Sequence, residues 1–151
     1  MKRCAAWLPA VMWMAIIFGM SAMPGDVSGE QSGRLVTLLC ALFRFLTGGD
    51  VPPESLYALE TLVRKGAHFM EYALLGALYL YALCASGVRA PYAVSLALSA
   101  LYACSDEIHQ AFVPGRGPAA ADVLLDTLGA ACFLALLRAI SAVRKRKSQP
   151  S

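Results

Sequence analysis

The stretch AHFMEYALLGALYLYALCAS, Ala67–Ser86, decides the class of this protein. Its length matches the roughly 20 helical residues that cross a hydrocarbon core of about 30 Å. The full chain of 151 residues shares this apolar character, with 58% apolar residues, 15% charged residues and a mean hydropathy of +0.58. A soluble domain carries roughly 25% charged residues. The composition therefore predicts an integral membrane protein, and the chain contains no nucleic-acid-binding motif.

Three further apolar runs are long enough, or nearly so, to span a membrane. They cover about Ala5 to Met23, Ala90 to Ile108 and Ala119 to Ala142. The run that begins at Ala90 is the weakest, because its apolar part ends near Cys104. The first run follows Lys2 and Arg3 as a signal peptide would, but its length and the poor cleavage site after it favour a retained anchor. We therefore expect an all-α, polytopic membrane protein: one domain over residues 1–151, with a bundle of four transmembrane helices.

The basic residues predict the orientation of these spans, because Lys and Arg in short loops favour the cytoplasm. With the amino terminus inside, the cytoplasmic segments hold eight of the 13 basic residues and none of the ten acidic ones. These eight are Lys2, Arg3, Arg89, Arg138, Arg144, Lys145, Arg146 and Lys147. Both termini are thus expected in the cytoplasm, with residues 143–151 as a basic tail.

A loop of about residues 24–66 separates the first two spans and is expected outside the cytoplasm. It opens with SAMPGDVSGEQSG, whose Pro and Gly residues predict a turn-rich exit from the membrane. The next segment, RLVTLLCALFRFLTGG, is apolar but too short to span, which predicts an interfacial or shallow re-entrant helix. A new helix is expected near Pro52 and Pro53, running into the second span through Lys65.

The second span carries polar residues on one helical face. Their spacing is i, i+4, i+7 and i+8, and they are Arg64, His68, Glu71 and Tyr72. Glu71 lies about 9 Å below Lys65 along the helix. Because an ionised carboxylate at that depth is costly, we expect Glu71 to face the bundle interior, where it is paired, hydrated or protonated.

The stretch SDEIHQAFVPGRG, Ser105–Gly117, ends the third span with another polar face. Asp106, His109 and Gln110 share that face, whereas Glu107 points about 100° away and is expected to face solvent. The fourth span begins with Asp122 and Asp126 one turn apart. Their like charges need a cation, proton or metal nearby, and Arg116 in the intervening turn is the closest cation along the chain.

All these polar groups fall at the same ends of their spans, so they predict one site shared by three helices. The candidate catalytic residues are His68, Glu71, Asp106 and His109. The candidate substrate-binding residues are Arg64, Lys65, Tyr72, Gln110, Arg116, Asp122 and Asp126.

The pattern leaves several uses of this site open. An enzyme would use His68 or His109 as general base and Arg116 as an anion clamp, with water as the nucleophile. A binder or carrier would hold an amphiphile without chemistry, and structural ion pairs would only set helix packing. Two histidines with carboxylates also suit a divalent metal, but no H-E-x-x-H pattern occurs.

Cysteines and small residues predict no site of their own. The five cysteines include no C-x-x-C pair, and four lie in or beside predicted spans as ordinary apolar residues. Gly66, Gly76 and Gly129 are expected to let helices approach closely.

Three blocks of the sequence resemble the VanZ-like membrane proteins of bacteria. They are MPGDVSGEQSG, RKGAHFMEYALLG and YACSDEIHQAFVPGRGPAAADVLLDTLGA, in that order between apolar spans. The resemblance implies a small multi-pass protein of the bacterial cytoplasmic membrane and envelope, in a family with a member associated with lowered susceptibility to the lipoglycopeptide teicoplanin. It implies membrane lipids, and a lipid-linked cell-wall precursor or a lipoglycopeptide, as partners. It supplies no settled activity.

Overall fold

A computed structural model describes residues 2–147 and confirms an all-α protein, with no strand among these residues. The helices are α1 (Lys2–Ala5), α2 (Leu8–Ser21), α3 (Gly25–Thr47), α4 (Pro53–Ser86), α5 (Pro91–Gln110) and α6 (Ala120–Lys147). The basic tail expected at 143–151 belongs to α6 as far as Lys147, and residues 148–151 lie outside the described part.

Three segments are long and apolar enough to cross a membrane. They are Arg3–Ser21, Pro53–Ser86 and Ala120–Arg146. The expected third span corresponds to α5, which is not among these candidates and carries Asp106 and Glu107 near its end. The structure therefore supports a membrane protein with three candidate spans.

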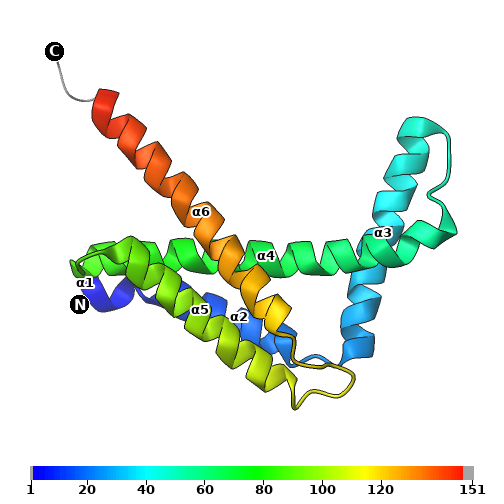
Figure 1. Cartoon of the computed structure of the whole chain (residues 1–151), viewed down its shortest axis with the longest axis horizontal. Coiled ribbons are helices and arrows are strands. Elements are labelled where there is room, and N and C mark those ends of the chain that lie inside the picture. Colours follow the sequence, from blue (N-terminus) through cyan, green and yellow to red (C-terminus); the bar gives the residue numbers. More distant parts are fainter. Residues whose placement is uncertain (1, 148–151) are drawn as a thin grey trace.

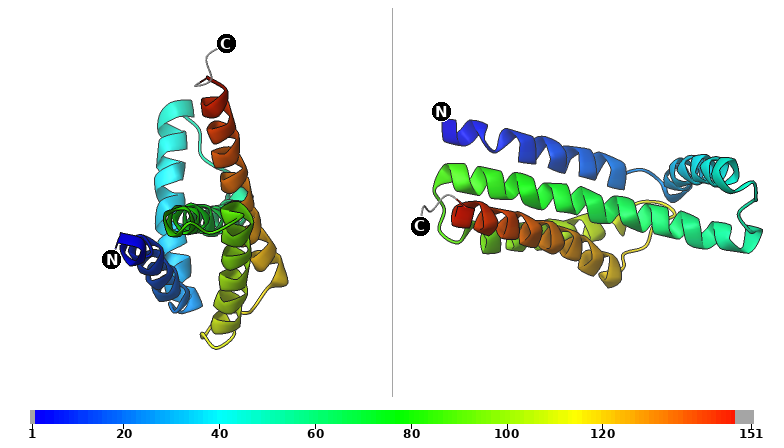
Figure 2. Two further views of the ribbon diagram at one scale, coloured as in Figure 1. Left: turned by 90° about the vertical axis from the view of Figure 1, so that its left-hand side faces the viewer. Right: turned by 90° about the horizontal axis from the view of Figure 1, so that it is seen from above.

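The four helices α2, α4, α5 and α6 form the bundle, with α4 at its centre and packed most extensively on α6. The N-terminus, the α4–α5 turn and the end of α6 lie at one end, which we call the terminal end (Figures 1 and 2). The α2–α3 link and the α5–α6 loop lie toward the other end, which we call the loop end. The α3 helix lies across α4 there rather than along it.

The α3 helix corrects the expected turn-rich exit after the first span. It is continuous from Gly25 to Thr47, with Gly29 and Gly33 inside it. Each glycine costs a helix roughly 1 kcal/mol relative to alanine. Packing of α3 against α4, which buries Val36 of α3, offsets this cost. Gly48, with a φ of 74°, ends the helix in the left-handed region. The continuous helix from Pro53 past Lys65 confirms the predicted restart.

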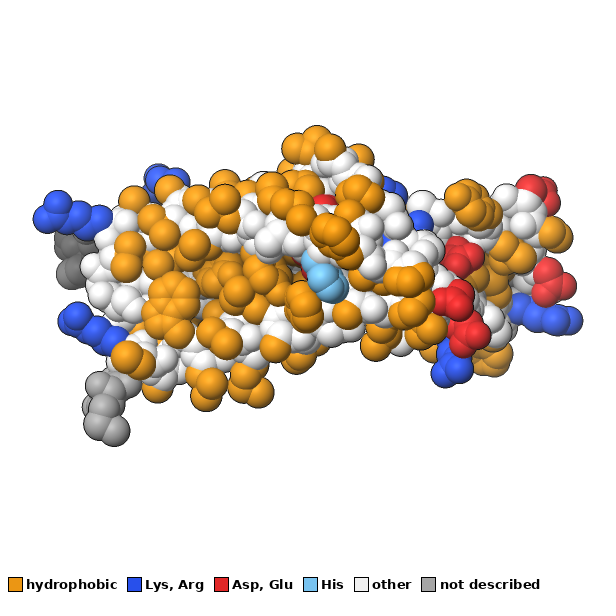
Figure 3. Space-filling view, turned by 90° about the horizontal axis from the view of Figure 1, so that it is seen from below, with side chains coloured by type: hydrophobic (Ala, Val, Ile, Leu, Met, Phe, Trp, Pro, Cys, Tyr) orange, Lys and Arg blue, Asp and Glu red, His pale blue; other side chains and the backbone are white. Residues whose placement is uncertain are grey.

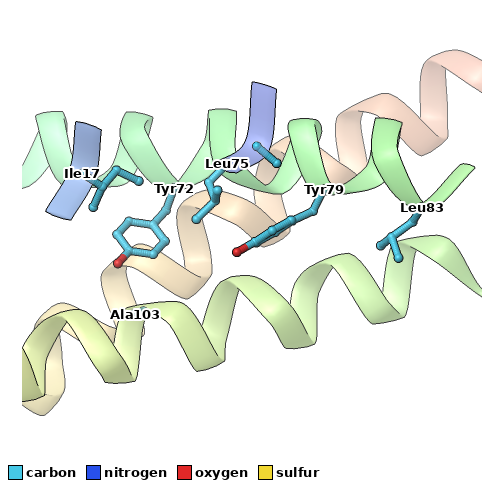
Figure 4. Close-up of a cluster of buried hydrophobic side chains, with 7 residues drawn as sticks. Ile17, Tyr72, Leu75, Tyr79, Leu83 and Ala103 are labelled. Atoms are coloured by element: carbon cyan, nitrogen blue, oxygen red, sulfur yellow. The ribbon is translucent and has the colours of Figure 1, made fainter. Parts of the chain in front are cut away.

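The core follows one face of α4. Tyr72, Leu75, Tyr79 and Leu83 recur every three or four residues and are buried against Ile17 of α2 and Ala103 of α5 (Figure 4). Hydrophobic side chains also cover much of the face of the molecule that Figure 3 shows, and charged side chains gather toward the two ends of this face. This distribution is the one expected of a bundle whose sides face lipid.

Small residues allow α4 and α6 to approach closely, as predicted. A Cβ on Gly129 would overlap the Phe69 carbonyl oxygen, and one on Gly76 would lie 3.2 Å from the Ala130 Cβ. Gly66 faces open space and takes no part in this packing.

Candidate functional site

Two polar cavities adjoin each other at the loop end of the bundle. Their volumes are about 180 and 250 Å3, and both are lined by Ser28, Arg64, His68 and Arg116. We call the two cavities together the cationic pocket. Because α3, α4 and the α5–α6 loop each contribute one or two of the four shared residues, the pocket exists only where these three elements meet.

The α4 helix supplies one wall through the spacing that the sequence predicted. Arg64, His68 and Glu71 lie at i, i+4 and i+7, and all three line the smaller cavity. Lys65 turns toward the larger cavity, where its ammonium group lies 2.7 Å from the Asp122 carboxylate of α6. The wall therefore combines unpaired and paired cations.

A backbone contact holds α3 against the α5–α6 loop. The Gly25 N–H donates to the Pro114 carbonyl oxygen at 3.0 Å. A Cβ on Gly25 would overlap the Gly115 carbonyl oxygen, and Gly115 itself has a φ of 74°. Only glycine fits both requirements without strain. This contact fixes Ser28 and Arg116 on the same pocket.

The two guanidinium groups of the pocket have no ion pair within 4 Å in the described part of the chain. Arg64 and Arg116 face both cavities, and the Arg116 guanidinium reaches only the Met20 carbonyl oxygen, at 3.5 Å. Burial lowers the pKa of Arg116, the Asp106 carboxyl raises it, and the neighbouring Arg64 lowers it again. A guanidinium nevertheless stays protonated in proteins. The pocket thus presents two guanidinium groups that are not directly paired with a carboxylate of the described chain.

His68 and Glu71 form the pair of the pocket that is suited to proton transfer. His68 Nδ1 lies 3.7 Å from Glu71 Oε2, longer than a hydrogen bond, and both side chains are mostly buried. The Trp13 indole N–H donates to the Glu71 carbonyl oxygen at 2.9 Å, which anchors this turn of α4 against α2. A histidine beside a carboxylate can accept a proton from a bound group.

Asp106 lies behind the pocket, in a hydrogen-bonded group with Ser21 and Gln110 that we call the buried layer. The Ser21 hydroxyl and the Gln110 amide donate to the same Asp106 oxygen, at 2.8 and 3.0 Å. Asp106 is 3% exposed and lines neither cavity, whereas Gln110 reaches the larger one. The structure therefore gives Asp106 contacts that tie α5 to α2.

Glu107 corrects the expectation of a solvent-facing side chain. It is 5% exposed, and its carboxylate accepts a hydrogen bond from the Ala119 backbone N–H at 2.7 Å. The α5–α6 loop folds back, so the start of α6 covers Glu107. The free N–H groups and positive dipole of a helix N-terminus attract a carboxylate. Glu107 thus acts as a cap for α6.

Three other candidates lie away from both cavities. The His109 ring packs against Phe18, with ring centroids 4.3 Å apart. Tyr72 and Asp126 are 0% and 1% exposed, inside the bundle. Within residues 2–147, no three His, Cys, Asp or Glu side chains are close enough together to hold a metal ion. In this part of the chain, the histidines and carboxylates that would suit a divalent metal are not grouped as a set of ligands.

Sequence reasoning missed the α3 wall of the pocket. Ser28, Gln31, Ser32 and Leu35 line the smaller cavity, and their spacing is i, i+3, i+4 and i+7. This helical spacing was the available signal, but the glycines between these residues suggested turns. Ser21 was missed because its partner, Asp106, lies 85 residues away.

Comparison with known proteins identifies a family for this chain. No curated protein and no solved structure shows significant similarity to the chain. The model of the VanZ/LLP1 family matches residues 6–141, which include the helices and loops that line the cationic pocket. The chain belongs to the VanZ/LLP1 family.

Proposed function

We propose that this protein binds the anionic headgroup of a lipid or lipid-linked envelope component in the cationic pocket. The observation that carries the proposal is the pair Arg64 and Arg116, which line the same two cavities without an ion pair in the described chain. A guanidinium grips phosphate or carboxylate through two parallel hydrogen bonds. Two neighbouring guanidinium groups repel each other, and an anion bound between them offsets this repulsion.

The proposed setting is the outer face of the bacterial cytoplasmic membrane, with four spans and both termini in the cytoplasm. The start of α1 and the end of α6 lie toward the same end of the bundle (Figure 1), which supports placing both on one side of the membrane. In this arrangement α3 lies in the interface, because it runs across the bundle and leaves Leu38, Phe45 and Leu46 exposed. The cationic pocket then opens at the level of lipid headgroups.

Cysteine labelling tests the orientation. The five native cysteines are first replaced by serine or alanine, and a single cysteine is placed at Gly117 or Val88, in the loops at opposite ends of the bundle. Gly117 has open space for a side chain. An impermeant thiol reagent on intact cells should label the Gly117 variant only. Labelling of the Val88 variant alone would show that the protein has the opposite orientation.

Binding is tested with purified protein in detergent, with phosphatidate and phosphatidylcholine as probes. Charge-assisted hydrogen bonds contribute about 1.5–3 kcal/mol each, so Arg116→Gln should weaken phosphatidate binding about tenfold or more. Arg64→Gln should act in the same direction. Arg34→Gln is the matched control, because Arg34 is an exposed base of α3 that lines neither cavity. Equal affinity of all variants at normal thermal stability would refute the proposal.

Catalysis is a second candidate, favoured because His68 and Glu71 line the same cavity as the two guanidinium groups. His68 would accept a proton from a water molecule that attacks the headgroup phosphorus, and Glu71 would stabilise the imidazolium. The phosphoester bond opposite the attacking water would then break, and the imidazolium would return the proton to the leaving alkoxide oxygen. His68→Gln and Glu71→Gln separate the two functions. Catalysis is supported if these variants bind phosphatidate normally but lose their activity in cells. The profile of lipid-linked precursors, measured by mass spectrometry, should then also change. An unchanged profile of lipid-linked precursors supports binding without catalysis.

Teicoplanin susceptibility is the cellular readout that family membership suggests. Expression of the protein is expected to lower susceptibility in a sensitive bacterium, and Arg116→Gln is expected to abolish this effect at an equal protein level. An unchanged effect in Arg116→Gln would favour the alternative that the polar residues only set helix packing.

A further inference from the structure

An apolar groove adjoins the cationic pocket along α4. Its volume is about 470 Å3, with Trp13 of α2 and Phe133 of α6 on its sides and Met70 and Leu74 of α4 between them. Ala67 and Glu71 line this groove and also the smaller polar cavity. The groove and the smaller cavity therefore lie side by side at this turn of α4.

The chemistry changes along α4 from charged to apolar. Arg64 and Leu74 lie on opposite sides of the junction, ten residues apart, which is about 15 Å along a helix. Glu71 is the only ionisable residue in the groove lining, and it sits at the junction. Met70 is 63% exposed and Leu74 40%, so the groove opens sideways where the bundle faces lipid.

The sides of the groove are held by contacts with α4. The Trp13 indole is fixed by its hydrogen bond to the Glu71 carbonyl oxygen. On the other side, close contact of Gly129 with Phe69 holds the α6 backbone against α4, one turn before Phe133. The groove is therefore formed before a ligand arrives, as binding sites for small molecules usually are.

We propose that the ligand is an amphiphile with a phosphate-bearing headgroup in the cationic pocket and one hydrocarbon chain in the groove between Trp13 and Phe133. This inference rests on the proposed function and specifies the ligand class. The two guanidinium groups supply the selectivity for the headgroup. The groove supplies alignment rather than much affinity, because a hydrocarbon chain is already in an apolar solvent within the bilayer.

Tryptophan fluorescence tests the position of the chain. The protein has two tryptophans, and Trp7→Phe leaves Trp13 as the only one. The variant is placed in phosphatidylcholine bilayers that contain a small fraction of phosphatidate with brominated acyl chains, which quench indole on contact. Trp13 should lose at least twice as much emission as it does with the same fraction of brominated phosphatidylcholine. In Trp13→Phe, Trp7 should show no such difference.

A second pair of variants tests the junction between pocket and groove. Ala67→Phe fills the junction. It should reduce the excess quenching of Trp13 by brominated phosphatidate, relative to brominated phosphatidylcholine, at least twofold. Ala67 is exposed, so the larger side chain is compatible with folding. Ala85→Phe is the matched control, because Ala85 is an exposed alanine of the same helix outside the groove lining.

The outcomes distinguish this inference from the proposed function. Selective phosphatidate binding without selective quenching of Trp13 would overturn the chain position and leave the headgroup site intact. Absence of selective binding would overturn both. Selective quenching that survives in Ala67→Phe would overturn the continuous path from pocket to groove, whereas its loss in Ala67→Phe alone supports that path.

Discussion

The buried layer and the cationic pocket are neighbouring polar regions at the loop end of the bundle. They differ in whether their charged groups have direct partners within the protein. In the buried layer, two donors share one Asp106 oxygen and no cation takes part. In the cationic pocket, Arg64 and Arg116 face open cavities without an ion pair in the described chain. Buried polar groups in proteins are normally hydrogen-bonded, and Asp106 Oδ2 meets this rule through Ser21 and Gln110, whereas Asp106 Oδ1 has no hydrogen-bond partner in the described chain.

The difference separates structural from ligand-binding roles. Removal of a group from the buried layer leaves its partners unsatisfied inside the protein, which lowers stability. Removal of a guanidinium from the pocket breaks no ion pair, and for Arg116 only a 3.5 Å contact with the Met20 carbonyl oxygen is lost. Stability should therefore change little while binding falls. Stability and binding should therefore respond to different variants.

Asp106→Ala should give the largest loss of stability. The substitution removes the acceptor of Ser21 and Gln110, and unsatisfied buried donors cost about 1–3 kcal/mol. Thermal unfolding in detergent measures the effect, and Asp106→Asn should retain part of the stability because its amide oxygen still accepts. A melting temperature equal to that of the unmodified protein would remove the distinction between the two regions.

Glu107→Ala should have an intermediate effect. It removes the acceptor for the Ala119 N–H at the start of α6, and loss of a helix cap costs about 0.5–2 kcal/mol. Glu107→Gln keeps an acceptor and should lose less. The same unfolding assay applies, and a larger loss in Glu107→Gln than in Glu107→Ala would contradict the capping role.

Lys65→Gln should lower stability by less than about 1 kcal/mol. The Lys65 and Asp122 side chains are 43% and 36% exposed, and partly exposed ion pairs contribute little because water and salt screen them. A double-mutant cycle with Asp122→Asn, measured at low and high salt, gives the coupling. A coupling above 2 kcal/mol would place this pair with the buried layer instead.

His109→Phe should have the smallest effect, with phosphatidate binding unchanged. The phenyl ring keeps the contact with Phe18, and His109 lines neither cavity. Arg116→Gln provides the comparison, because Arg116 lines both cavities. Weaker binding in His109→Phe at normal stability would mean that His109 also contacts the ligand.

Local patterns predicted much of this arrangement. The spacing of Arg64, His68 and Glu71 placed them on one face because a helix repeats every 3.6 residues. Glu107 could not be placed in the same way, because its burial depends on how the α5–α6 loop folds back onto α5. The α3 wall escaped prediction for a related reason, since packing against α4 outweighs the local cost of Gly29 and Gly33.

The sequence by itself determined the membrane class, most of the helix positions and the gathering of polar residues at one end of the apolar runs, because hydropathy and helical periodicity are local properties. The tertiary structure alone decided which polar groups are paired and which remain open to a ligand. Ser21 meets Asp106 across 85 residues, and Gly25 meets Pro114 across a comparable distance along the chain. Such pairings follow from how helices cross and loops fold, which no short stretch of sequence specifies.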